Sequence, residues 1–422
     1  MSTDTEISGP HYDVIVIGGG ASGMMAAGRA GECGKRVLLV EKNKVVGKKL
    51  SITGGGRCNI TNAEKDTRKF LENYGDAAKF LFSPFSQFGM AQTFVFFGSK
   101  DLPLVTQARK RVFPESEDAR DVTAVMKKYA TKNGVTLNTG TRVHEFILKD
   151  GVIVGIKTSK GTFLADNFVL ATGGAAHQET GSTGEGLEWL SALGHTVHEP
   201  NPNIVPLIAE EEWAKKLSGK TLSFMKITFS DAKGTKKTRF SKTGKILFTH
   251  FGVSGPLILN AAHAVKQLLK HGPVTATIDM YPDTEVGTLR NRVLEAFNMH
   301  KNKELRSVLK EFVPAGMSEA VAEQFSPELR TMRVHSVPKE VRNQLVDRLK
   351  AMPLTITGTM GLDWAVISDG GVELSEVDTK TMRSKKYPNL YFTGDVLHIN
   401  RPSGGYSLQL CWTTGWVAGS NV

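Results

Sequence analysis

The sequence predicts an α/β fold, a doubly wound parallel sheet that is interrupted by a β-rich insert and a small helical insert. Three observations predict it. A strand, a helix and a second strand follow one another within residues 12–41, which is the order of a parallel βαβ unit. Between residues 194 and 353, short alternating strands give way to helical stretches. An apolar strand at residues 390–393 then ends in glycine, so we expect the first domain to resume at the C-terminus.

Length and composition agree with several folding units. The 422 residues are about twice the usual size of one compact domain. Apolar residues make up 40% and charged residues 23%, which excludes a disordered or collagen-like chain. We predict a first domain at residues 1–195 and 354–422, a β-rich insert at residues 196–283 and a helical insert at residues 284–353.

Segments for export, membranes or metals are not evident. No run of about 18 uncharged apolar residues is present, which argues against a membrane span. Residues 1–10 are polar and acidic, unlike an export signal. The three cysteines, Cys33, Cys58 and Cys411, are too few and too scattered for a disulfide framework or a Cys-based zinc site. We therefore expect a cytoplasmic protein without a bound metal.

The individual elements follow in order. Residues 12–17 (YDVIVI) form a β-branched strand that stops at three glycines, a helical pattern covers residues 22–33, and a second strand at residues 36–40 ends at Glu41. The remaining elements of the first domain are a helix at 120–133, strands at 135–137 and 143–148, a hairpin of 151–158 and 162–170, a strand at 390–393 and a buried helix at 408–417. In the inserts, strands and turns lie within 204–279, and helices follow at 289–297, 305–312 and 340–352.

The glycines after the first strand fit the pattern GxGxxG through Gly18, Gly20 and Gly23. The first glycine permits a tight turn, the second lets the backbone approach a pyrophosphate, and the third lets the helix pack on the strand. Glu41 follows Gly18 by 23 residues, at the end of the next strand, where a carboxylate can accept hydrogen bonds from an adenosine ribose. The motif in this context predicts a dinucleotide site.

A second glycine-bearing strand end favours FAD over NAD. Gly394 and Asp395 follow the strand at residues 390–393, and a helix start with the sequence GGYS lies at residues 404–407. FAD extends beyond its pyrophosphate, so an acidic residue can bind the ribityl hydroxyls and a helix N-terminus can stabilise negative charge on the reduced flavin. NAD needs no such second contact. The alternative is that Asp395 only caps a helix.

Residues 47–62 (GKKLSITGGGRCNITN) resemble the signature of a bacterial family of FAD-dependent oxidoreductases. Members of this family are described as aminoacetone oxidase-like proteins, bile-acid-pathway flavin reductases or ribosomal RNA dihydrouridine synthases. Further blocks occur in the family's order at residues 180–186, 194–195, 205–207, 247–256, 370–372 and 404–406.

The resemblance implies a three-layer Rossmann-like FAD-binding domain that is interrupted by an inserted β-barrel-like domain and a small helical domain, with flavin at their junction. The loop from Gly54 to Asn59 would lie beside the flavin, and Arg57 would supply positive charge or form a salt bridge that holds the loop. The candidate cofactor-binding residues are Gly18, Gly20, Ala21, Ser22, Gly23, Glu41, Lys42, Lys49, Gly54, Gly55, Gly56, Arg57, Cys58, Asn59, Val143, Ala171, Thr172, Gly173, Gly174, Gly394, Asp395, Gly404, Gly405, Tyr406 and Ser407.

The sequence departs from the family near the second FAD block. We expect an acidic residue where His398 stands and an asparagine where Ser407 stands, and residues 400–403 (NRPS) are unusual as well. These departures concern the substrate and the redox properties rather than the fold.

Three residues are candidate proton donors, because the flavin itself carries the hydride and the protein must orient the substrate and supply a proton. They are Cys58, His250 and His398, and each has a structural alternative: a buried thiol for Cys58 and ordinary hydrogen bonding for the histidines. Cys411 lies in an apolar helix and is expected in the core. A Cys-x-x-Cys pair and a second GxGxxG are both absent from the sequence, which argues against a disulfide reductase and against a separate NAD(P)H domain.

The net charge of +11 is concentrated in the inserts. Residues 201–355 contain 24 Lys and Arg against 15 Asp and Glu, and residues 215–245 contain ten basic residues and a single acid, Asp231. Such a surface concentrates polyanions, whereas a lysine-rich hairpin can also simply prevent an edge strand from pairing. The candidate nucleic-acid-binding residues are Lys233, Lys236, Lys237, Arg239, Lys242 and Lys245.

The leading hypothesis is an FAD-dependent reductase that takes electrons from NAD(P)H and reduces uridine to dihydrouridine in 23S ribosomal RNA. The family includes such enzymes, and the basic insert would contact phosphates. One alternative is an FAD-dependent oxidoreductase that acts on a small metabolite, an enone or an amine. Another is a non-catalytic RNA-binding factor that flavin stabilises.

Overall fold

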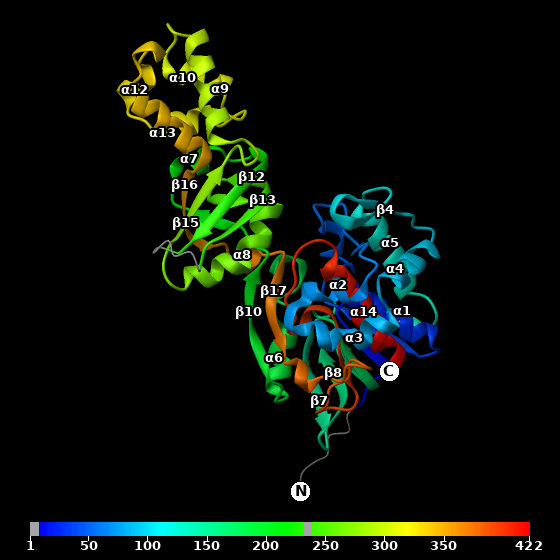
Figure 1. The fold of residues 1–422 in the computed structure, drawn as a ribbon. Coiled ribbons are helices and arrows are strands. Elements are labelled where there is room, and N and C mark those ends of the chain that lie inside the picture. The colour runs from blue at the N-terminus through cyan, green and yellow to red at the C-terminus, as the bar shows by residue number, and fades with distance from the viewer. Residues whose placement is uncertain (1–7, 232–237) are drawn as a thin grey trace. The chain divides into compact units, whose positions relative to one another are not determined.

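The structure, a computed structural model, describes residues 8–231 and 238–422. These residues form two compact units (Figure 1). Unit 1 consists of the described residues up to Pro202 together with Val366–Val422, and unit 2 consists of Asn203–Ala365. The chain leaves unit 1 once and returns to it, so unit 2 is an insertion. The helical insert predicted at residues 284–353 and most of the β-rich insert predicted at residues 196–283 fall within unit 2. Residues 196–202 belong to unit 1 instead, and residues 354–365 belong to unit 2.

Unit 1 is built on a seven-stranded sheet with the order β6–β2–β1–β9–β8–β7, in which β18 also pairs with β9. The pairs around β1 are parallel, whereas β7, β8 and β9 form antiparallel hairpins. The strands are β1 (His11–Ile17), β2 (Val37–Glu41), β6 (Val135–Thr139), β7 (Val143–Lys149), β8 (Val152–Thr158), β9 (Gly161–Leu170) and β18 (Leu390–Phe392). Because β2 and β9 lie on opposite sides of β1, a crevice opens at the carboxyl end of β1, where doubly wound sheets bind ligands.

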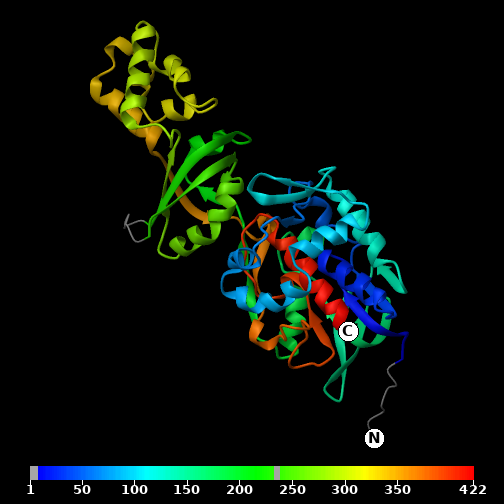
Figure 2. The ribbon, with the colours of Figure 1, turned by 45° about the vertical axis from the view of Figure 1, so that its right-hand side comes forward.

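The first and last helices of unit 1 pack against each other (Figures 1 and 2). They are α1 (Ala21–Glu32) and α14 (Tyr406–Asn421). A Cβ atom on Gly415 or Gly419 of α14 would overlap the backbone oxygens of Ser22 or Ala26 in α1, so only glycine permits this distance between the helices. This contact brings the C-terminal segment beside the glycine loop that follows β1.

The other elements of unit 1 surround this framework. A small sheet has the order β3–β5–β4, and β10 pairs with β17. The strands are β3 (Thr61–Asn62), β4 (Leu104–Gln107), β5 (Arg111–Pro114), β10 (Val197–Asn203) and β17 (Ile367–Val372). The helices are α2 (Thr67–Leu71), α3 (Ala78–Gln87), α4 (Met90–Gly98), α5 (Ala119–Ala130) and α6 (Glu185–Ala192).

Unit 2 contains a closed barrel with the order β11–β14–β13–β12–β15–β16. Its strands are β11 (Leu207–Ala209), β12 (Thr221–Ser230), β13 (Phe240–Thr249), β14 (Gly252–Ser254), β15 (Val274–Asp279) and β16 (Met352–Thr359). Apolar side chains that alternate along β12, β13 and β15 fill the interior. The helices are α7 (Glu212–Lys216), α8 (Pro256–Leu269), α9 (Val286–Met299), α10 (Leu305–Val308), α11 (Ser318–Ala322), α12 (Pro327–Thr331) and α13 (Lys339–Lys350).

The predicted fold class is confirmed, since a Rossmann-type α/β sheet and an inserted barrel with additional helices are present. The helix expected at 120–133 is α5, and the hairpin expected at 151–170 is β8 and β9. The helices α2, α3 and α4, within residues 67–98, are not among the elements that the sequence pattern predicts. None of the helices in the described part of the chain is long and apolar enough to cross a membrane.

Candidate functional site

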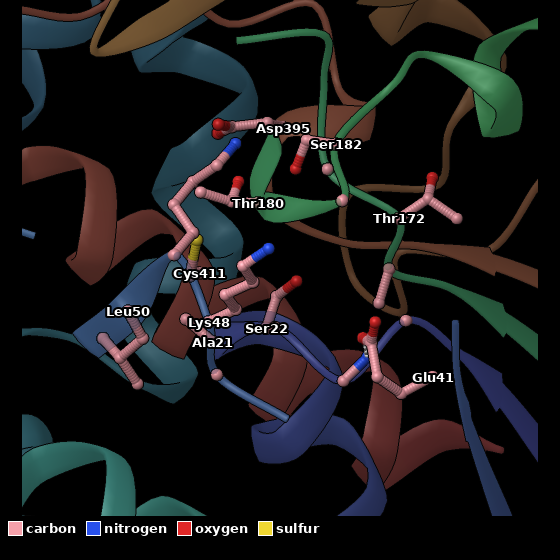
Figure 3. A pocket seen from close by; sticks show the side chains of 18 of the residues that line it. Ala21, Ser22, Glu41, Lys48, Leu50, Thr172, Thr180, Ser182, Asp395 and Cys411 are labelled. Carbon is pink, nitrogen blue, oxygen red and sulfur yellow. Dashed lines mark hydrogen bonds between the residues drawn. The ribbon is translucent and has the colours of Figure 1, made fainter. Parts of the chain in front are cut away.

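A cavity of about 1210 Å³, which includes the solvent at its mouth, lies in unit 1 at the carboxyl ends of the central strands. The wall is formed by the loop after β1, the end of β2, the segment of residues 47–53, the end of β9, the segment of residues 180–185 and the C-terminal segment. Figure 3 shows Glu41 and Asp395 on opposite sides of it.

The glycine loop provides backbone at one part of this wall. Gly18 has a φ of +107°, a conformation that only glycine adopts readily, and a Cβ on Gly23 would overlap the carbonyl oxygen of Gly18. By contrast, a Cβ on Gly20 would meet nothing within 4 Å. Gly20 caps α1 without a side-chain hydrogen bond, so the first N–H groups of α1 face open space, which suits a pyrophosphate.

Glu41 is held at the edge of the glycine loop. Its Oε2 accepts a hydrogen bond from the Gly19 N–H at 2.7 Å, and its Oε1 accepts from the Asn43 N–H at 2.7 Å and from Asn43 Nδ2 at 2.8 Å. Only 8% of Glu41 is exposed. These bonds fix a carboxylate where the ribose of a dinucleotide is expected, and Asn43 is a supporting residue that sequence analysis missed.

Thr172 lines the cavity, but its hydroxyl does not face it. Its Oγ1 is buried and has no hydrogen-bond partner, and a Cβ on Gly186 would lie 2.1 Å from this oxygen, so the hydroxyl packs against α6. The open space at Gly20 and the anchored carboxylate of Glu41 are the features of the wall that fit FAD.

Arg401 forms a buried ion pair on the far side of the cavity. Its side chain is 1% exposed, and its guanidinium pairs with the Asp395 carboxylate. Nε donates to Ser407 Oγ at 3.0 Å, and Nη1 donates to the Ile399 carbonyl at 2.9 Å. Two departures from the family pattern, Arg401 and Ser407, are therefore hydrogen-bonded to each other. Sequence analysis noted only that residues 400–403 are unusual.

Lys49 and Cys411 line the cavity beside this ion pair. Lys49 Nζ donates to the Ala176 carbonyl at 2.6 Å. Burial lowers the pKa of Lys49, although Asp395 opposes this shift. Burial raises the pKa of the Cys411 thiol to about 12, so the thiol is neutral at ordinary pH. The expectation that Cys411 belongs to the core is wrong, because it lies one turn after Ser407 on the face of α14 that borders the cavity (Figure 3).

The loop from Gly54 to Asn59 is not part of the cavity wall, which ends at Thr53 in this segment of the chain. Arg57 donates from Nη2 to Gln107 Oε1 at 2.6 Å, forms a salt bridge with Glu117 at 3.1 Å and lies over the Phe113 ring at 4.3 Å. These contacts agree with the alternative in which Arg57 forms a salt bridge that holds its loop. A direct role of Arg57 toward the flavin stays a prediction.

The three candidate proton donors do not meet at the cavity. Cys58 is fully buried, and burial raises the pKa of its thiol far above the ordinary value. The His398 ring stacks on His198 at 4.1 Å between centroids, and burial lowers its pKa, as does the charge of His198. Neither Cys58 nor His398 lines the cavity, and His250 is an exposed residue of unit 2. Their roles as acids stay predictions.

Many candidate cofactor-binding residues do meet there. The structure brings to the cavity wall Gly18, Gly20, Ala21, Ser22, Glu41, Lys42, Lys49, Val143, Ala171, Thr172, Gly173, Asp395 and Ser407. The wall does not include Gly23, Gly174, Gly394, Gly404, Gly405 or Tyr406. Residues of the wall that sequence analysis did not name as cofactor-binding include Asn43, Lys48 and Thr180–Glu185. Residues 180–186 form one of the blocks that resemble the family, and this resemblance could have identified them as part of the site.

Six basic residues of the inserted part of the chain are the predicted contacts to a polyanion. Arg239, Lys242 and Lys245 are exposed there. Lys233, Lys236 and Lys237 lie outside the described residues. Within the described ranges, residues 8–231 and 238–422, no three His, Cys, Asp or Glu side chains are grouped as a metal site.

The family model described as HI0933-like protein Rossmann domain matches residues 12–421. A curated relative from Clostridium scindens, named 3-dehydro-bile acid delta(4,6)-reductase, is 31% identical over 96% of this chain and 97% of its own length. The ribosomal RNA dihydrouridine synthase of Escherichia coli is 26% identical over 97% of this chain and 98% of its own.

Solved structures share the fold. A 3-ketosteroid Δ1-dehydrogenase from Sterolibacterium denitrificans aligns with a TM-score of 0.54 at 13% identity, covering 97% of this chain and 99% of that one. A 3-ketosteroid-Δ4-(5α)-dehydrogenase from Rhodococcus jostii aligns with a TM-score of 0.53 at 15% identity, covering 100% and 98%. The match of the family model to nearly the whole chain, with a relative at 31% identity, places this protein in the HI0933-like Rossmann family, the family of FAD-dependent oxidoreductases that the TGGGRCN segment resembles.

Proposed function

We propose that this enzyme binds FAD in the cavity of unit 1 and uses NAD(P)H to reduce a carbon–carbon double bond that is conjugated with a carbonyl group. The observation that carries the proposal is the chemistry shared by its two named relatives. A Δ4,6-reductase of a 3-dehydro bile acid and a dihydrouridine synthase both add two hydrogens across such a bond. The substrates differ greatly in size, whereas the reacting group is the same.

The cavity supplies the groups that such a reaction requires. The glycine loop and Glu41 would hold the adenosine diphosphate end of FAD, and Asp395 would bind the ribityl chain. Bound flavin supplies the hydride and accepts a new one from NAD(P)H. The buried Arg401 and the partly buried Lys49 would stabilise negative charge that develops at the wall near Asp395.

The first candidate substrate is a uracil base of 23S ribosomal RNA. Residues 203–365, which form unit 2, contain 24 Lys and Arg against 16 Asp and Glu, a net charge of +8 out of +11 for the chain. Phosphate contacts account for most of the affinity of a protein for RNA, and they require such a surface. A base within a folded RNA would have to leave its stack before it could reach a cavity.

The test of this substrate is mass-spectrometric mapping of ribosomal RNA nucleosides from cells with and without the gene. We expect one or more dihydrouridines to disappear on deletion and to return when the wild-type gene is supplied. A variant that cannot hold the cofactor, Gly20→Val, should not restore them. The rRNA assignment is wrong if every dihydrouridine persists after deletion.

A second candidate is a small enone, which the 31% identity to the bile-acid reductase favours. Purified enzyme would be mixed with NADH or NADPH and a 3-oxo-Δ4,6 steroid, and nicotinamide oxidation would be followed by absorbance. Turnover on the steroid with unchanged rRNA would support the small substrate. Turnover on neither substrate would contradict the proposed reaction class.

A further inference from the structure

The pairing of β12 with β13 in unit 2 is interrupted by a bulge. Leu222 lies opposite Ile246, and Met225 lies opposite Gly244, so two residues of β12, Ser223 and Phe224, face a single residue of β13. That single residue is the intervening lysine at position 245. Two residues opposite one is the pattern of a β-bulge, which redirects the side chains that follow.

The bulge turns Phe224 out of the barrel. Strict alternation after the buried Leu222 would place Phe224 inside and Met225 outside. Instead Met225 is buried, and Phe224 is 77% exposed, more than any other large hydrophobic residue that the structure describes. Phe224 also has a φ of +59°, a conformation that is strained for a bulky side chain. Strained backbone that exposes an aromatic ring is characteristic of functional sites.

Two lysines lie on the strands beside the exposed ring. Lys245 lies across the bulge from Phe224, and Lys226 follows two residues later on β12. Lys242 is also exposed on β13, but it pairs with the buried Ile227 and so lies on the other face of the two strands. Neither β12 nor β13 contains an acidic residue. The carboxylate opposite Lys226 on β15 belongs to Asp279, which is already paired with Lys350 at 2.8 Å. Within the described residues, none of the three lysines forms an ion pair.

We propose that Phe224, Lys226 and Lys245 form a binding site for single-stranded RNA, in which an unpaired base stacks on the Phe224 ring and the lysines contact the flanking phosphates. Aromatic side chains beside a basic surface bind single strands in this way, because every base has a face that can stack. The bases of an RNA duplex are already stacked on one another, which favours a loop or single strand as the partner. The inference rests on the proposed RNA substrate and adds a contact outside the FAD cavity.

The test uses the full-length protein with its bound flavin and a fluorescent oligouridine, with affinity measured by anisotropy at several salt concentrations. Phe224→Ala is expected to weaken binding roughly 5- to 150-fold, since stacking contributes about 1–3 kcal/mol per base. Phe224→Trp should restore it. Charge reversal by Lys226→Glu with Lys245→Glu should weaken binding further and reduce its dependence on salt.

Matched controls come from the same unit. Met299→Ala removes another exposed hydrophobic side chain, 73% exposed, and Lys310→Glu reverses a lysine that lies in the helical part; both should leave the affinity unchanged. The inference is overturned if Phe224→Ala changes the affinity by less than about twofold, which is within the small effect of an ordinary surface substitution. Equal affinity for a polyglutamate peptide or for a duplex of the same length would overturn it as well.

The RNA site and the proposed function can fail separately. Formation of dihydrouridine by a Phe224→Ala variant with unchanged RNA affinity would contradict the RNA site and support the proposed function. Loss of RNA affinity in that variant, in an enzyme that leaves rRNA unmodified, would support the site and contradict the rRNA substrate.

Discussion

Replacement of Arg401 by methionine is expected to destabilise unit 1 by about 3 kcal/mol. Removing one partner of a buried ion pair typically costs about 3–5 kcal/mol, because the other charge is left without compensation. The Arg401 side chain is 1% exposed and that of Asp395 is 18% exposed. The lower end of the range applies, since water reaches Asp395 and the buried Lys49 supplies some opposite charge.

The assay must report on unit 1 alone, because a chain with two compact units need not unfold in one step. Hydrogen–deuterium exchange at increasing urea, read by mass spectrometry from peptides of α14, gives the free energy of unfolding of unit 1. The absorbance of bound flavin, recorded on the same samples, shows whether Arg401→Met also loses cofactor. A loss of flavin without a loss of stability would point to a direct contact instead of the ion pair.

A double variant separates the ion pair from simple packing. Arg401→Met combined with Asp395→Asn should be more stable than the sum of the two single effects predicts, because no charge is then left unpaired. Lys157→Met serves as a control: its pair with Glu145 is 62% and 61% exposed, and we expect a change below about 1 kcal/mol. The reasoning is refuted if Arg401→Met costs less than about 1 kcal/mol, or if the two substitutions are additive.

Three further predictions concern other parts of unit 1. Gly20→Val should fold normally and lose flavin absorbance, since its Cβ meets no atom of the chain. Gly23→Ala should instead lower the free energy of unfolding by about 1–3 kcal/mol or more, since its Cβ overlaps a carbonyl oxygen. In the native protein a thiol reagent should label the exposed Cys33 and leave Cys58 unlabelled until urea is added; rapid native labelling of Cys58 would contradict its burial. His195 Nδ1 lies 2.6 Å from Glu376, yet burial lowers the pKa of His195 more than Glu376 raises it. The folded state therefore prefers the neutral ring, and the free energy of unfolding should fall as the pH drops below 6.5. Burial opposes ionisation of Glu376, but hydrogen bonds from Thr196, His195 and Lys386 hold its pKa at about 2. Stability should therefore fall a second time as the pH drops from 4.5 to about 2. Urea titrations of the wild type and of His195→Gln should show the loss below pH 6.5 only in the wild type.

Sequence patterns were sufficient where the structure is local. A β-branched strand, three glycines and a helix in succession predicted β1, its loop and α1, because turn, cap and helix depend on neighbouring residues. The same reasoning located α5 and the hairpin of β8 and β9 to within a few residues. It missed α2, which has only five residues, and α3 and α4, of which α3 contains Pro84; α3 and α4 pack against α14, far away in the chain.

The sequence by itself determined the family, the fold class and the glycine-loop part of the dinucleotide cavity, because these depend on short motifs and on repeating patterns. Only the tertiary structure decided which distant side chains face that cavity. The close approach of α14 to α1 at Gly415 turns Cys411 toward the cavity, and the burial of Arg401 depends on Asp395. The exposure of Phe224 likewise depends on its register with β13. Burial and register are set by packing partners far apart in the chain, and no local pattern specifies them.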